Sequence, residues 1–421
     1  MNDYRIAGID VHKKMLAVVV AELTAAGELA FQRRPFDNTE AGIHQMRDWF
    51  VECQVREAVM ESTAQYWRTV WLELEEKFRL HLAQAMSNRA PRGRKRDYAD
   101  AERLVRRLIA GELVLSYVPG REQRLWRMLA REKHLARRAR VQQVNALEAF
   151  LEQIRIKLSS VLSDITGVSG WRILEALAKG EPEPAKLAKL ADPSVQCTRE
   201  QIQAALAAAP HVCAEERAVL RQFLDRIELF GKQIADNDRL LAACLARYQD
   251  AVTRLAEIAG LGADSAQQMI AEIGPKAEAF DSPAQLSSWI GVCPGREESA
   301  GVSKSDRSPK GNRPMRRLLA QCANAAIKAK GSVFELYYRR KVAHLGHFQA
   351  VWAVAHKLCR VIWKVLHDGV RYEERGSRLN SKQEAKQLQR LKRTLRLLGY
   401  DPNSLRKLQA PNNIAPGLSM V

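Results

Sequence analysis

Residues 4–22, YRIAGIDVHKKMLAVVVAE, decide the fold of the first part of the chain. Two short hydrophobic runs in this stretch are separated by the polar triplet His12-Lys13-Lys14. Short apolar runs that are bounded by turn residues are typical of β-strands. The stretch therefore predicts two strands, Tyr4–Asp10 and Met15–Glu22, joined by a tight turn.

The segments that follow continue an alternation of strand and helix patterns. In chain order we expect a strand at Glu28–Pro35, a helix at Thr39–Cys53 with Thr39 as its N-cap, a strand at Arg56–Met60, a helix at Gln65–Phe78, a strand at Leu80–Met86 and a helix that contains Asp97 and Asp100. Three strands in a meander, followed by helix, strand, helix, strand and helix, is the order of a ribonuclease-H-like α/β domain.

This order predicts that carboxylates from distant parts of the chain meet. Asp10 ends the first strand and Glu61 directly follows the fourth, while Asp97 and Asp100 lie one turn apart on one helix face. If the first and fourth strands are neighbours, these oxygen ligands converge on a site for Mg²⁺, with Mn²⁺ as the alternative ion. Two such ions can clamp a phosphodiester. Each carboxylate taken alone is more often a solvated loop or cap residue.

The charge of the chain indicates a polyanionic partner. Its 421 residues include 67 Lys and Arg against 48 Asp and Glu, a net charge of +19. Nucleic acid and an anionic membrane surface both fit such an excess. The longest apolar runs, such as Leu16–Val20, are too short to span a membrane, which favours nucleic acid. Arg94, Lys95 and Arg96 stand directly before Asp97 and are candidate phosphate contacts.

The cysteines indicate a reducing compartment. There are seven, they are scattered, and no two form a CxxC pair. This argues against a disulfide framework and against a zinc site, and we expect a cytoplasmic protein.

The middle of the chain is helical and charged. Arg124–Ile156 and Glu215–Tyr248 predict two long helices, and Gly180–Pro184 marks a break between them. A protruding antiparallel pair or coiled coil and an ordinary helical bundle both fit this pattern.

Two later segments are candidate nucleic-acid contacts. Ile258–Ala266 carries Gly260 and Gly262 and resembles a helix-hairpin-helix turn, which would hold DNA by its backbone, although such turns also serve packing alone. Gly291–Asn312 is rich in Gly, Ser, Pro and cations and predicts a functional loop. Its four serines are Ser299, Ser303, Ser305 and Ser308. The candidate phosphate contacts are Lys304, Arg307 and Lys310 within the segment and Arg313 directly after it. Composition alone favours phosphate contact over catalysis by a serine, and the loop has no nearby histidine for a hydrolase triad.

The C-terminal part offers weaker signals. His344, His347 and His356 lie in an apolar helical stretch and are better explained as core residues than as metal ligands. Residues 371–421 hold 11 Lys and Arg against 4 Asp and Glu, and Lys382–Leu398 predicts either a basic nucleic-acid-binding helix or a solvated terminus.

Five motifs occur in an order that resembles a known family. They are Gly8–Lys13, Met60–Thr63, Asp97–Ala101, the Cys293-Pro294 and Ser299–Gly301 pair, and Lys310–Arg313. Together they resemble the DEDD-type transposases of bacterial insertion sequences, the "one-ten" family and its "eleven-eleven" branch. The resemblance covers residues 4–370.

The resemblance implies a RuvC-like domain at 1–120, a helical connector at 121–250 and a transposase domain with the serine loop at 251–375. The basic tail at 376–421 has no counterpart in the family. The resemblance also implies a catalytic tetrad of Asp10, Glu61, Asp97 and Asp100, and Ser299 as the nucleophile that forms a phosphoserine–DNA intermediate. Ser303 and Ser305 are close enough to compete for that role. It further implies a bacterial cytoplasmic protein that acts on element ends and target DNA, a non-coding guide RNA, and a dimer or tetramer.

Three other functions remain open at this point. A junction-resolving endonuclease would use the tetrad to activate water and the serine loop to grip DNA. A non-catalytic DNA- or RNA-binding scaffold would carry a degenerate tetrad. A sugar-kinase or actin-like ATPase could begin with Gly8–Val11, but no second glycine-rich phosphate loop accompanies it.

Overall fold

The computed structural model describes residues 4–23, 28–62, 64–88, 97–293, 295, 297–299, 302–305, 308–374, 376 and 381–397. Residues 23, 86, 297–299, 302–305 and 381–387 among them are described by their backbone alone. The chain divides into unit 1, Met1–Arg121, and unit 2, Glu122–Val421. Within the described residues, no helix is both long and apolar enough to cross a membrane.

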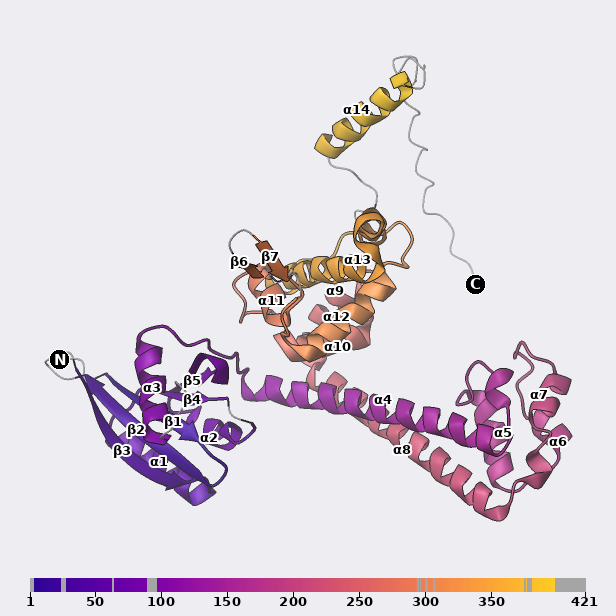
Figure 1. Ribbon diagram of the computed structural model, residues 1–421, viewed down its shortest axis with the longest axis horizontal. Helices are drawn as coiled ribbons and strands as arrows, with labels where there is room; N and C mark the ends of the chain where they lie inside the picture. The colour runs from indigo at the N-terminus through magenta and orange to yellow at the C-terminus, as the bar shows by residue number, and fades with distance from the viewer. Residues whose placement is uncertain are drawn as a thin grey trace. The chain divides into compact units, whose positions relative to one another are not determined.

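Unit 1 contains a five-stranded mixed sheet (Figure 1). The strands are β1 Arg5–Val11, β2 Met15–Leu23, β3 Leu29–Asp37, β4 Glu57–Glu61 and β5 Arg79–Ala83, in the order β3-β2-β1-β4-β5. The first three strands are antiparallel neighbours, whereas β4 is parallel to both β1 and β5. The expectation of a mixed α/β N-terminal part is confirmed.

Helices cover both faces of this sheet. They are α1 Glu40–Glu52, α2 Trp67–Leu74 and α3 Asp97–Ile109, with a short 3₁₀ turn, η1, at Ala85–Asn88. The predicted N-cap of α1 is confirmed, since Gly42 N donates to Thr39 Oγ1 at 3.3 Å. Ala7, Ile9 and Val11 pack in the cluster that contains the buried residues of α1 and α2. Ile6, on the opposite face, packs with the buried residues of α3. Since side chains alternate along a strand, Gly8 and Asp10 belong to the α3 face.

Unit 2 is almost entirely helical. Two long helices, α4 Arg121–Gln153 and α8 Ala214–Cys244, lie side by side and antiparallel (Figure 1). Lys133 pairs with Asp238 and, further along, Gln143 bonds to Arg226, which is the antiparallel register. At one end of this pair, α5 Val168–Ala178, α6 Pro184–Ala188 and α7 Arg199–Ala205 close a separate hydrophobic core with 3₁₀ turns η2 Leu158–Ser160 and η3 Ala209–His211. The long helices predicted at 124–156 and 215–248 are thus present.

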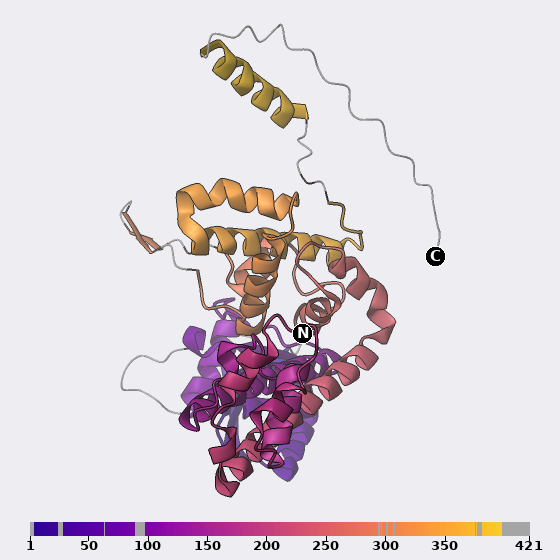
Figure 2. The same cartoon turned by 90° about the vertical axis from the view of Figure 1, so that its right-hand side faces the viewer.

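The rest of unit 2 is a helical cluster with one hairpin (Figure 2). Its elements are η4 Ala246–Tyr248, α9 Gln249–Ala256, α10 Ala263–Ile273, α11 Pro283–Ile290, β6 Glu297–Ser299, β7 Val302–Ser305, α12 Arg313–Ala326 and α13 Val333–His367. One further helix, α14 Ser381–Leu397, follows them in the chain. Helix α13 is interrupted at Gly346, which has a positive φ of 74°. The predicted loop at 291–312 differs from the structure because β6 and β7 pair within it. A two-stranded ladder satisfies backbone hydrogen bonds without apolar side chains, so composition did not reveal it.

Candidate metal site and serine hairpin

The first two candidate ligands are placed by the register of two parallel strands. Ile9 of β1 pairs with Met60 of β4, and Asp10 and Glu61 each come one residue later. Parallel register neighbours project to the same face, so both carboxylates belong to the face that α3 covers. The sequence predicted this proximity on the condition that β1 and β4 are neighbours, which they are.

The second pair is delivered by a close crossing of α3 over β1. Asp97 and Asp100 lie in the first turn of α3. A Cβ atom built on Gly8 would lie 2.4 Å from the backbone oxygen of Ala101 and 2.8 Å from Val105 Cγ2. The helix therefore sits directly on the strand, two residues before Asp10, because residue 8 has no side chain.

Replacing Gly8 by alanine is expected to displace α3 and loosen the carboxylate cluster. The clash is with helix backbone, which cannot move away without moving Asp97 and Asp100. We expect the free energy of unfolding to fall by about 1–3 kcal/mol, the usual range for overpacking. Urea unfolding measures this change, and metal titration measures the loosened site.

Gly231→Ala is the matched control, since nothing lies within 4 Å of a Cβ at that position in α8. Alanine there should be neutral or stabilising, by up to about 1 kcal/mol. If Gly8→Ala unfolds at the wild-type urea concentration, then α3 does not need the contact.

Asp10 is the electrostatic centre of the cluster. It is only 9% exposed, and burial raises the pKa of its carboxyl, with Asp100, Glu61 and Asp97 adding to the increase and His12 opposing it. The other three predicted tetrad members therefore all raise the pKa of this one buried carboxyl. Like charges gathered in this way destabilise the ionised state unless a cation joins them.

Neighbouring side chains orient individual members of the cluster. Asn88 of η1 is 3% exposed, and its Nδ2 donates to Glu61 Oε2 at 3.1 Å. Arg103, one turn further along α3, forms an ion pair with Asp100, and its Nε donates to the backbone oxygen of Asn88 at 3.2 Å. Helix α3 and η1 thus hold Glu61 and Asp100 through one shared network.

The donor atoms fit a divalent cation. One oxygen each of Asp10 and Asp97 and a ring nitrogen of His12 all lie within 4.8 Å of one another. Asp10 Oδ2 and His12 Nε2 are buried and have no hydrogen-bond partner among the described residues. Buried polar atoms are rarely left unpartnered, and a bound ion would satisfy both. His12 was not predicted as a site residue, although its place two residues after Asp10 was a signal.

The serine hairpin is anchored at its base. Ser299 is the last residue of β6 and pairs by backbone register with Val302 of β7, while its side chain lies outside the described atoms. Arg316 of α12 donates to the backbone oxygens of both Gly291 and Pro309, the latter at 2.7 Å, and to Ser308 Oγ at 3.1 Å. One guanidinium therefore holds the two ends of the segment together.

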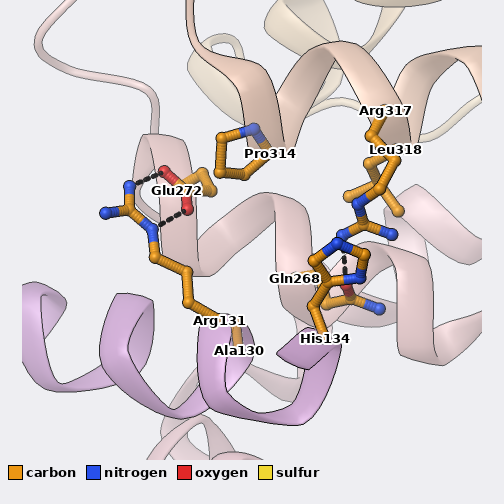
Figure 3. Close-up of a pocket in the computed structure, with 8 residues that line it drawn as sticks. All are labelled: Ala130, Arg131, His134, Gln268, Glu272, Pro314, Arg317 and Leu318. Atoms are coloured by element: carbon orange, nitrogen blue, oxygen red, sulfur yellow. Dashed lines mark hydrogen bonds and ion pairs between the residues drawn. The ribbon is translucent and has the colours of Figure 1, made fainter. Parts of the chain in front are cut away.

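Asn312 ties the same segment to the helices of unit 2. Its Oδ1 accepts from Met315 N at 2.9 Å and caps α12, and its Nδ2 donates to Glu272 Oε2 at 3.3 Å. Glu272 is 3% exposed and is held by Arg131 through two bonds of 2.9 and 3.0 Å (Figure 3). The motif Lys310–Arg313 thus has a structural role through Asn312.

Figure 3 shows the small cavity beside this carboxylate. It has a volume of about 30 Å³ and is lined by Ala130, Arg131, His134, Gln268, Glu272, Pro314, Arg317 and Leu318. Burial lowers the pKa of His134, with nearby arginines adding to the decrease. A volume of this size holds about one water molecule, so the cavity serves packing rather than substrate.

The two glycines of the predicted hairpin turn behave differently. Gly260 has a φ of +88°, and a Cβ there would lie 2.5 Å from Ala326 N, so packing against α12 explains this glycine. Gly262 has open space around it and precedes α10 without a side-chain cap. Only Gly262 offers an open approach to a helix N-terminus.

The other predicted nucleic-acid contacts are only partly described. Lys310 and Arg313 are both exposed. Lys310 lies just before α12, and Arg313 is its first residue. Arg94, Lys95, Arg96 and Arg307 lie outside the described residues, and Lys304 is described by its backbone alone.

Two family models match the chain in separate segments. The DEDD transposase model of the IS110 type matches residues 7–156, which include the four carboxylates. The model described as "Transposase IS116/IS110/IS902 family" matches residues 252–339, which include Gly260, Gly262 and Ser299.

Two insertion-element proteins are similar to parts of the chain. The IS900 uncharacterized 42 kDa protein of Mycobacterium paratuberculosis is 27% identical over 157 residues, which cover 37% of this chain and 39% of the relative. The IS110 uncharacterized 43.6 kDa protein of Streptomyces coelicolor is 27% identical over 122 residues, 29% of this chain and 30% of the relative. The chain therefore spans less than half the length of either relative. Both family models match in order and the first of them contains the four carboxylates, so the comparisons support an IS110-family DEDD transposase.

Proposed function

We propose that this protein is a DNA transposase that cuts and rejoins strands with a metal-binding carboxylate tetrad and a serine nucleophile. The observation that carries the proposal is Asp10, a buried carboxylate with one oxygen that has no hydrogen-bond partner among the described residues, whose pKa is raised by burial and further by Asp100, Glu61 and Asp97. Such an arrangement is costly for the fold alone and useful for binding a divalent cation.

The topology of unit 1 supports this proposal. The strand order β3-β2-β1-β4-β5, with β4 parallel to β1, is that expected of a ribonuclease-H-like domain of the RuvC type. Asp10 and Glu61 lie near the carboxyl ends of two neighbouring parallel strands, and the first turn of α3 carries Asp97 and Asp100. These residues would hold Mg²⁺, with Mn²⁺ as the alternative. A divalent ion bound there supplies charge neutralisation at a scissile phosphate.

Ser299 is the proposed nucleophile. Its Oγ attacks the phosphorus, a P–O bond to serine forms, and the 3′-oxygen leaves and takes up a proton as a 3′-hydroxyl. The hydroxyl of a second DNA end then attacks the phosphoserine, and the serine oxygen leaves. One phosphodiester bond is broken and one is formed, so no nucleotide triphosphate is needed. Arg316 and Asn312 would hold the hairpin that carries Ser299.

The remaining parts would bind nucleic acid. We propose that Gly262 at the start of α10, together with Lys310 and Arg313, contacts DNA or guide-RNA phosphates, as do Arg94, Lys95, Arg96, Lys304 and Arg307. The antiparallel α4 and α8 pair is the proposed connector, and the active form is a homo-oligomer.

Trapping of the covalent intermediate tests the proposal. The full chain is incubated with DNA from its own flanking sequence and with RNA transcribed from that flank, with Mg²⁺ or with chelator. We expect a protein–DNA adduct and rejoined strands with Mg²⁺ only. Hydrolysed ends without an adduct would instead support a junction-resolving endonuclease, and DNA binding without any strand breakage would support a scaffold.

A further inference from the structure

His12 brings a nitrogen atom into the carboxylate cluster. The residue directly follows β1, and its backbone is fixed on both sides. His12 N donates to Met15 O at 2.9 Å, and Asn38 Nδ2 donates to His12 O at 2.8 Å. The turn between β1 and β2 therefore holds the imidazole at the same end of the sheet as Asp10.

The imidazole meets two carboxylates at ligand-like distances. Its Nε2 lies 3.1 Å from Asp10 Oδ2 and 3.4 Å from Asp97 Oδ1. In an octahedral site with metal–ligand bonds of about 2.1 Å, adjacent ligand atoms are about 3 Å apart. The spacing of these atoms thus matches neighbouring ligands of one ion.

A simple ion pair explains the contact less well. A protonated imidazole would direct its N–H along one of the two carboxylates, yet neither contact is a hydrogen bond, since Nε2 and Asp10 Oδ2 have no hydrogen-bond partner among the described residues. Asp10 is also 91% buried, as its 9% exposure shows, and its Oδ2 faces the nitrogen at 3.1 Å. Two buried ligand atoms that face each other without a hydrogen bond indicate a cation that both of them bind.

We propose that His12 Nε2 is a direct ligand of the divalent cation beside Asp10 and Asp97, so that the site has mixed nitrogen and oxygen ligands. This inference rests on the proposed metal site and adds a ligand that the tetrad does not contain. Imidazole favours transition-metal ions, whereas Mg²⁺ favours oxygen. The site therefore prefers Mn²⁺ to Mg²⁺ more strongly than an all-carboxylate site would.

Pulsed electron paramagnetic resonance of bound Mn²⁺ tests the assignment directly. Mn²⁺ is added to the full chain after chelation, and the ¹⁴N modulation of a coordinated imidazole is recorded. We expect modulation in the wild type and its loss in His12→Gln, with Mn²⁺ affinity reduced by roughly tenfold and Mg²⁺ affinity reduced less. His44→Gln is the matched control. That histidine lies on α1, with its Nε2 3.5 Å from Glu73, and it should leave the modulation unchanged.

Other results would overturn the assignment. Modulation that survives in His12→Gln, or Mn²⁺ that binds in an Asp10-dependent way without any nitrogen coupling, would exclude His12 while leaving the carboxylate site intact. If Asp10→Asn leaves Mn²⁺ binding unchanged, the result would instead contradict the proposed metal site itself, and with it the role of His12. If His12→Gln fails to fold, the wild type is instead prepared with ¹⁵N-labelled histidine. The labelling must then change the nitrogen modulation relative to unlabelled protein, and an unchanged pattern rejects the inference.

Discussion

Asp10→Asn is expected to reduce DNA strand cleavage and rejoining by at least about 10²–10³-fold, the loss seen when one preorganised electrostatic group is removed. The same substitution is expected to stabilise the metal-free protein by about 1 kcal/mol, because it removes a buried carboxylate with one oxygen that has no hydrogen-bond partner among the described residues. Activity and stability should therefore change in opposite directions. Gel assays of DNA products measure the first, and urea unfolding in chelator measures the second.

The pH dependence of this effect has a definite sign. Burial raises the pKa of the Asp10 carboxyl, so the folded state binds its proton more tightly than the unfolded state. This contribution to stability is present at low pH and is lost as pH rises through the folded-state pKa. The wild type in chelator should lose stability across that range relative to Asp10→Asn, and Mg²⁺ should restore it only in the wild type. Asp48→Asn is the control, since Asp48 is exposed and pairs with Arg47. If both variants behave alike, Asp10 is an ordinary carboxylate.

Ser299→Ala is expected to abolish the covalent protein–DNA adduct and strand rejoining, with a loss of at least about 10³-fold, because no other group would form the phosphoester bond. Binding of Mg²⁺ or Mn²⁺ to the tetrad should be unchanged, since alanine alters no carboxylate. Denaturing gels of radiolabelled DNA report the adduct, and calorimetric titration reports the metal.

Ser303→Ala and Ser305→Ala are the matched controls. Both serines lie on β7, within the same hairpin, and should retain the adduct. If the adduct persists in Ser299→Ala and disappears in one of these variants, the neighbouring serine is the nucleophile. Ser308 is a weaker competitor, because its hydroxyl already accepts a bond from Arg316.

Parts of the fold and of the site could be predicted from local pattern. The strands of unit 1 follow from short apolar runs, and the N-cap of α1 follows from Thr39, since these features depend on neighbours in sequence. The proximity of Asp10 and Glu61 required only that β1 and β4 be adjacent. The pairing of β6 with β7 was not predicted, because its residues are polar and its hydrogen bonds belong to the backbone.

The sequence by itself determined which carboxylates are available, the strand and helix order that gathers them, and the excess of cations that suits a polyanion. The tertiary structure alone decided how they meet. The crossing of α3 over Gly8 sets the approach of Asp97 and Asp100, Asn88 orients Glu61, and the turn after β1 directs His12 at Asp10. These contacts join residues far apart in the chain, or depend on a side-chain direction that only packing sets, so no local periodicity encodes them.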